Sequence, residues 1–94
     1  MRFATLVHPT ARVSSRADIG EGCFISPMAV VSSNTTLGEQ VFVNRGALIG
    51  HHTKIGSFVT VQPGANIAGM VTIGDGAYIG MGSTIIDWIS VGQN

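Results

Sequence analysis

An unbroken six-residue repeat of aliphatic side chains constrains this chain more than any other feature. The repeat begins at residue 7 and keeps its register through fifteen positions: Val7, Val13, Ile19, Ile25, Val31, Leu37, Val43, Ile49, Ile55, Val61, Ile67, Ile73, Ile79, Ile85 and Val91. An amphipathic helix repeats every ~3.6 residues and a half-buried strand every ~2, so neither accounts for the pattern. A fixed repeat of this kind indicates a repeat architecture instead.

Small side chains stand four residues after the aliphatic ones. Thirteen such positions hold Ala, Cys, Thr, Val or Ser, and glycine often follows the aliphatic residue directly. The small residue and the next aliphatic residue are two apart, so both point inward from one short strand. The residues between two strands turn a corner, where glycine adopts backbone angles that other residues resist. Three units make a triangular coil of 18 residues, which predicts an all-β chain, a parallel β-helix of about five coils.

The 18-residue coil sorts the outward side chains onto three faces. The first carries Phe24, Phe42, Thr60 and Tyr78; the second carries Val30, Leu48, Asn66 and Thr84; the third carries Asp18, Thr36, Lys54, Thr72 and Ser90. Only 11% of the residues are charged, and a monomer rarely leaves an aromatic column in solvent. We therefore expect a homotrimer with roughly parallel prism axes, closed by three-fold symmetry.

Composition also limits the partners and the compartment. The formal net charge is zero, which argues against a nucleic-acid partner. No apolar run is long enough to span a membrane, and the apolar stretch of MRFATLVHPT is too short for a signal peptide. The single cysteine cannot form an internal disulfide. We expect a cytoplasmic protein without a membrane partner.

Two of the three histidines, His51 and His52, are adjacent and fall on a predicted corner. Imidazole changes its protonation near neutral pH, so a corner histidine could take a proton from a substrate and return it. Gly69 lies one coil further on, where its backbone N–H could donate to the oxyanion of an acyl-transfer intermediate. The pattern alone leaves two interpretations open for His51: a solvated turn residue and a general base.

The run NRGALIGHHTKIGSFVTVQPGANIAG, residues 44–69, resembles the core of the hexapeptide-repeat acyltransferases, and among them the sugar O/N-acetyltransferases that modify sialic acids and bacillosamine-type amino sugars. The matching residues are Asn44, Gly46, Ala47, His51, Ile55, Gly56, Phe58, Pro63, Gly64, Ala65, Ala68 and Gly69. The opening HPTARVSSRADIGEG, residues 8–22, resembles the start of these helices. The resemblance implies a left-handed β-helix, although crossover connections are generally right-handed.

The resemblance also implies a reaction and roles for single residues. His51 matches the general base, which takes a proton from an amine or hydroxyl that attacks the thioester of acetyl-CoA. Gly69 matches a backbone contact to the acyl group, and Asn44 matches a polar residue near the site. The expected co-substrate is acetyl-CoA, and the expected acceptor is a sugar or sugar nucleotide bound at a subunit interface.

Three other residues are expected to contact substrate or CoA. Arg45, next to Asn44, could meet a phosphate of CoA. Many members of the family have an acidic residue next to the base, able to orient it, but here the neighbours are Gly50 and His52. Many also have a second histidine nine residues on, and here that place is Thr60. These two departures affect the substrate site or the tuning of the base.

Close relatives in this family are longer than this chain. We expect residues 1–6 to form a leader segment and residues 7–94 the β-helix domain, without the N-terminal nucleotide-binding domain and with the C-terminal coil and tail missing. The alternative function is a catalytically silent trimeric module, structural or binding, derived from such an enzyme.

A zinc site is not expected. Trimeric carbonic anhydrases of this fold need three histidines, two of them five residues apart, and Gly56 stands five residues after His51. His8 lies more than two coils away, and adjacent histidines poorly suit one tetrahedral ion.

Overall fold

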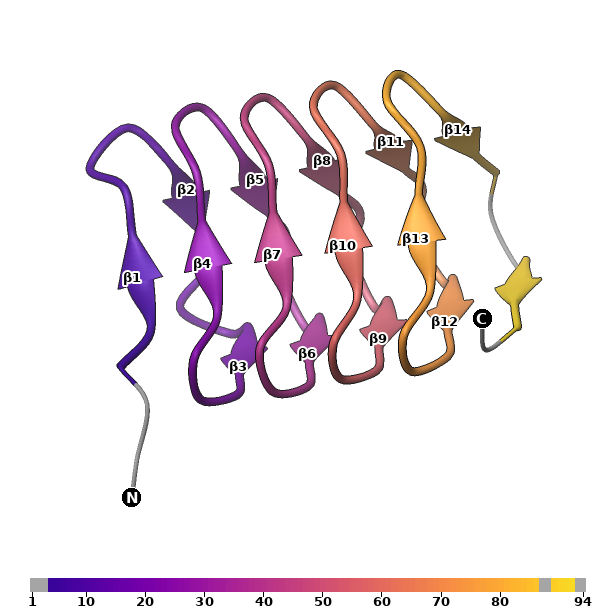
Figure 1. Cartoon of the computed structure of the whole chain (residues 1–94), viewed down its shortest axis with the longest axis horizontal. Helices are drawn as coiled ribbons and strands as arrows, with labels where there is room; N and C mark the ends of the chain where they lie inside the picture. Colours follow the sequence, from indigo (N-terminus) through magenta and orange to yellow (C-terminus); the bar gives the residue numbers. More distant parts are fainter. Residues whose placement is uncertain (1–3, 87–88, 93–94) are drawn as a thin grey trace.

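The computed structural model describes residues 4–86 and 89–92, which form a single triangular prism wound as a left-handed parallel β-helix (Figure 1). The prism holds fifteen two-residue strands in the described part of the chain, separated by four-residue corners. Its principal extents are 32 × 26 × 24 Å. The predicted fold class is confirmed. The predicted leader falls partly outside the described residues, and its last residue, Leu6, already belongs to the first strand.

Every strand pairs in parallel with the third strand along the chain, which builds three five-stranded sheets. Sheet A consists of β1 (Leu6–Val7), β4 (Phe24–Ile25), β7 (Phe42–Val43), β10 (Thr60–Val61) and β13 (Tyr78–Ile79). Sheet B consists of β2 (Arg12–Val13), β5 (Val30–Val31), β8 (Leu48–Ile49), β11 (Asn66–Ile67) and β14 (Thr84–Ile85). Sheet C consists of β3 (Asp18–Ile19), β6 (Thr36–Leu37), β9 (Lys54–Ile55), β12 (Thr72–Ile73) and β15 (Ser90–Val91).

The three corners of the prism are named by the sheets that they join. The A–B corner contains residues 44–47 and their equivalents in other coils, the B–C corner contains residues 50–53, and the C–A corner contains residues 56–59. The front strands of Figure 1 are those of sheet A, and the chain passes from each of them over the A–B corner to sheet B behind. Corner residues 18 positions apart therefore lie in one column along the prism.

The six-spaced aliphatic side chains fill the interior, as the repeat predicts. Those of the central coils are almost wholly buried, and each such burial stabilises the fold by about 1.5–3 kcal/mol. Val7 is 46% exposed because its strand has a neighbour on one side only. Two interior hydroxyls are also buried and both are satisfied: Thr35 Oγ1 donates to the Gly50 carbonyl at 2.8 Å and Thr53 Oγ1 to the Ala68 carbonyl at 3.1 Å.

The outward faces have the composition expected from the sequence. Sheet A carries the aromatic column, in which the Phe24 and Phe42 rings lie 5.2 Å apart between centroids. Tyr78 of the same column is 63% exposed in the single chain. Sheet C presents polar side chains, among them Thr36 and Lys54, to solvent. The sheet A column is thus an apolar surface that one copy of the chain leaves uncovered.

The third residue of each four-residue corner usually adopts a left-handed backbone conformation. Its N–H donates to a carbonyl of the preceding coil: His52 donates to Ser33 at 3.1 Å and Met70 donates to His51 at 2.9 Å. Glycine fills several of these positions, but six other residues in the described part of the chain adopt φ between 53° and 62°: Met28, Asn34, Gln40, His52, Phe58 and Met70. The described part of the chain has no helix that could cross a membrane.

Glycine follows every strand of sheet C from β3 to β15, and the close stacking of coils explains this column. A Cβ built on Gly38 would lie 2.7 Å from the carbonyl carbon of Gly56 and from the Ser57 nitrogen. A Cβ built on Gly92 in the same way would have no heavy atom within 4 Å. Stacking between coils, and not a left-handed backbone, therefore excludes a side chain at Gly38.

Replacing Gly38 by alanine should lower the free energy of unfolding by about 1–3 kcal/mol, the usual cost of overpacking. Gly92→Ala, in the same column, should change it by less than about 0.5 kcal/mol. Denaturant unfolding followed by circular dichroism at one fixed protein concentration measures both. Equal effects of the two substitutions would contradict the stacking explanation.

Candidate active site

His51 and His52 form the outer tip of the B–C corner that follows β8, and both side chains are exposed. Their rings are nearly perpendicular, at 86°, with centroids 5.3 Å apart. The two Nδ1 atoms nevertheless approach to 3.0 Å and share a hydrogen bond. The sequence did not predict this contact between the two nitrogens.

Gly69 lies directly one coil beyond His51 and is buried. The imidazole of His51 covers it: a Cβ on Gly69 would lie 2.8 Å from both Cε1 and Nε2 of His51. No left-handed φ accounts for glycine at this position. The absence of a side chain at residue 69 therefore makes room for the imidazole and leaves Nε2 close to the backbone of the next coil.

In the described corners the N–H of the second residue donates to no backbone carbonyl, and at some corners a side chain accepts it instead. Glu39 N–H donates to Ser57 Oγ at 3.0 Å, and Ser57 N–H donates to Asp75 Oδ1 at 2.8 Å. Gly69 occupies the same position of its corner, and no acceptor for its N–H occurs among the described residues. The residue that stacks over Gly69 in the next coil, Asp87, lies outside the described residues.

The other predicted site residues lie elsewhere on the prism. Asn44 and Arg45 belong to the A–B corner, where Asn44 Oδ1 accepts a hydrogen bond from the Arg45 N–H at 3.0 Å. Thr60 is a half-buried residue on the outer face of sheet A. Sheet A is the side of the triangle opposite the B–C corner, so one chain brings His51, His52 and Gly69 together but keeps Asn44 and Thr60 apart from them.

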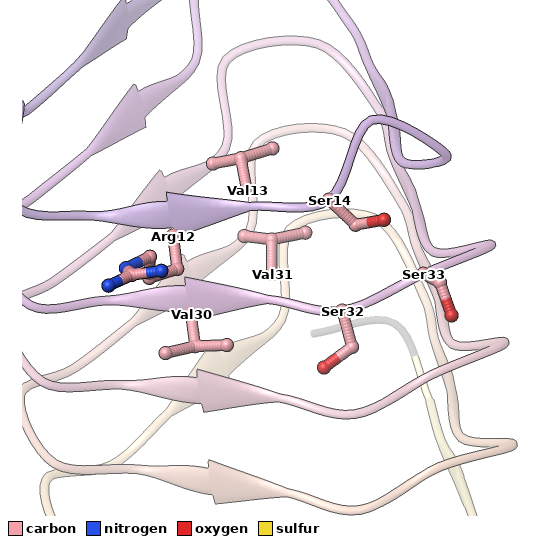
Figure 2. A pocket seen from close by; sticks show the side chains of 7 residues that line it. All are labelled: Arg12, Val13, Ser14, Val30, Val31, Ser32 and Ser33. Carbon is pink, nitrogen blue, oxygen red and sulfur yellow. The ribbon is translucent and has the colours of Figure 1, made fainter.

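Two surface depressions lie on sheet B and at the A–B corner. One, with a volume of 420 Å³, lies on sheet B in the coils before His51; Figure 2 shows Arg12 at one end of it and the hydroxyl groups of Ser14, Ser32 and Ser33 at the other. The second, of 460 Å³, follows the A–B corner. Its lining is Pro27, Met28, Arg45, Gly46, Pro63, Gly64 and Met81. Neither depression includes His51 or His52.

Cys23 offers no alternative nucleophile. It is 1% exposed, and its Sγ donates to the Gly38 carbonyl at 3.2 Å. Burial raises the pKa of the Cys23 thiol, which keeps it protonated at neutral pH. Within residues 4–86 and 89–92, no group of three potential metal-ligating side chains is found.

The architecture and the corner can be compared with known proteins. No protein-family model and no curated protein matches the chain in sequence. Among solved structures, the acetyltransferase domain of PglB from Neisseria gonorrhoeae FA1090, in complex with acetyl coenzyme A, is 35% identical with a TM-score of 0.97. The match covers 98% of this chain and 45% of that one. The resemblance to the hexapeptide-repeat sugar acetyltransferases is confirmed.

Two further acetyltransferase structures agree with this result. A second structure of the PglB acetyltransferase domain is 28% identical with a TM-score of 0.67, over 95% of this chain and 54% of that one. PerB from Caulobacter crescentus, in complex with CoA and GDP-perosamine, shares the fold at 18% identity and a TM-score of 0.53, over 97% of this chain and 53% of that one. This chain thus spans about half the length of these acetyltransferases.

Replacing Gly69 by alanine should push the His51 imidazole off the coil. Because the ring is exposed and can rotate away, the free energy of unfolding should fall by less than about 1 kcal/mol. The ring resonances of His51 in ¹H–¹⁵N correlation spectra should shift well beyond those of His8. In a His51→Ala background the same substitution has no ring to displace, so its effect on stability should vanish. Unshifted His51 resonances in Gly69→Ala would contradict the contact.

Proposed function

We propose that this protein transfers an acetyl group from acetyl-CoA to an amine or hydroxyl of a sugar or sugar nucleotide, with His51 as the general base. One observation carries the proposal. An exposed histidine covers a glycine whose N–H has no partner among the described residues, at a corner of a β-helix whose 35% identical neighbour is an acetyltransferase domain in complex with acetyl coenzyme A. PerB, which shares the fold, is in complex with GDP-perosamine as well as CoA.

The proposed reaction needs one proton acceptor and one oxyanion donor. His51 Nε2 takes the proton of the acceptor amine or hydroxyl as that nitrogen or oxygen forms a bond to the acetyl carbonyl carbon. The carbonyl oxygen gains negative charge, which the Gly69 N–H stabilises. The carbon–sulfur bond then breaks, and the CoA thiolate that leaves recovers the proton from His51. The acetylated sugar and free CoA are the products.

A homotrimer would complete the site. The B–C corner of one protomer, set against sheet A of its neighbour, would place Thr60 and Asn44 near His51, which one chain cannot do. The exposed aromatic column on sheet A favours such a contact, because closed three-fold symmetry would cover it in all protomers at once.

Arg45, which lines the depression of the A–B corner, is the proposed partner of a CoA phosphate. With a single cysteine and no internal disulfide, we place the reaction in the cytoplasm.

Replacing His51 by alanine should reduce acetyl transfer about 10²–10⁴-fold, the scale of general-base catalysis, while the trimer remains intact. A panel of amino sugars and sugar nucleotides with acetyl-CoA, followed by release of free CoA thiol, measures it. His8→Ala is the matched control, because His8 is also an exposed corner histidine but lies in another corner column. Undiminished turnover in His51→Ala would refute the base.

A wild-type protein that neither turns over nor gains thermal stability with acetyl-CoA would favour a silent structural module instead. Binding to the folded state alone must raise the melting temperature, so the thermal shift tests acetyl-CoA binding independently of the acceptor.

Replacing Phe42 by aspartate should break the trimer, because it would bury a charge against the neighbouring subunit. Light scattering at micromolar concentration should then report a mass near that of one chain, 9.8 kDa, in place of three. Thr36→Asp, on the polar face of sheet C, is the control and should leave the mass unchanged. A monomeric wild type would contradict the proposed assembly.

A further inference from the structure

The hydrogen bond between the two histidines constrains where their protons lie. A neutral imidazole carries one N–H and one bare nitrogen. His51 Nδ1 and His52 Nδ1 are 3.0 Å apart, so one of them must hold a proton and the other must offer a lone pair. Within the described residues, neither ring has another side-chain hydrogen-bond partner. Each histidine therefore sets the tautomer of the other.

Two arrangements of the neutral pair satisfy this bond. In the first, His51 donates from Nδ1, and its Nε2 is bare. In the second, His52 donates from Nδ1, and His51 carries its proton on Nε2. Only the first arrangement leaves a lone pair on the His51 nitrogen that lies over Gly69, and only a bare nitrogen can take a proton from a substrate.

We propose that His52 is the positioning residue for His51: its Nδ1 accepts the Nδ1–H of His51 and holds the tautomer in which Nε2 is the base. This inference rests on the proposed function. The bond also survives the proton transfer, since an imidazolium keeps its Nδ1–H, and the hydrogen bond to His52 becomes charge-assisted. Two neutral rings thus form a pair that is ready to accept one proton at a defined atom.

The backbone fixes the direction from which His52 reaches its neighbour. Its φ is 55°, and its N–H donates to the Ser33 carbonyl at 3.1 Å, so the turn is tied to the preceding coil. Residues in the same column share the left-handed conformation without sharing the imidazole: Asn34 has φ 57° and Met70 has φ 62°. The conformation therefore does not require histidine, and residue 52 can be exchanged without remaking the turn.

Two substitutions of His52 distinguish the effect of its hydrogen-bond acceptor from the effect of the rest of its side chain. His52→Met removes the acceptor nitrogen and installs the residue type that occupies this column one coil on. His52→Asp places a carboxylate oxygen, which only accepts, at the position of Nδ1, and Asp is among the residues that tolerate a left-handed backbone. Two-bond ¹H–¹⁵N spectra read each tautomer directly at a pH above the histidine titrations, and the chain has three histidines to assign.

The wild-type protein should show the Nδ1–H tautomer for His51 and the Nε2–H tautomer for His52. His51 should become a mixture dominated by Nε2–H in His52→Met and should keep Nδ1–H in His52→Asp. Acetyl transfer should fall about 10- to 100-fold in kcat in His52→Met, the scale for removing a residue that orients a functional histidine. The KM for acetyl-CoA should not change, and His52→Asp should regain most of the rate.

An Nε2–H tautomer of His51 in the wild type would overturn the inference, and so would an Nδ1–H tautomer that persists in His52→Met. The spectra need no substrate. A correct tautomer pattern in a protein without transferase activity would therefore refute the proposed function and not the pairing, which keeps the two failures distinguishable.

Discussion

The backbone hydrogen bonds between successive coils are the interaction on which everything else in this structure depends. A short strand of two residues cannot stand alone, and here each strand between the two ends of the stack bonds to the strands 18 residues before and after it in parallel register. Because buried N–H and C=O groups must be paired, any coil of another length would leave groups of its neighbours unsatisfied. The fixed coil length then dictates the columns: aliphatic residues above aliphatic residues inside, glycine above glycine after sheet C, and histidine above glycine at the B–C corner.

The sequence predicts the fold almost completely because three six-residue repeats equal the 18-residue register between paired strands. The inward set, the outward columns and the coil length all follow from a period of six. The handedness does not follow from it and came from the resemblance alone. The exposure of Val7 reflects the end of the stack, which a periodic pattern does not describe.

The site was less predictable, for a different reason. Column arithmetic places Gly69 next to His51, and the structure bears this out. The repeat does not predict that the His51 imidazole occupies the space where a Cβ of residue 69 would lie. It also does not predict that the two neighbouring rings meet through their Nδ1 atoms. Both contacts depend on side-chain torsions and on the left-handed turn at His52.

The left-handed corners have a consequence for how such a protein can change over evolution. Among the described residues, six positions hold a side chain where glycine would be conformationally easier, each at a cost of order 1 kcal/mol. A coil contacts only its neighbours along the stack, so that cost is local. These corners are therefore the places where new side chains can be tried one coil at a time while the interior stays unchanged. At most of these corners, replacing the side chain by glycine would raise the free energy of unfolding. At His52 the same replacement would also remove the imidazole, so a gain in stability there would cost a functional group.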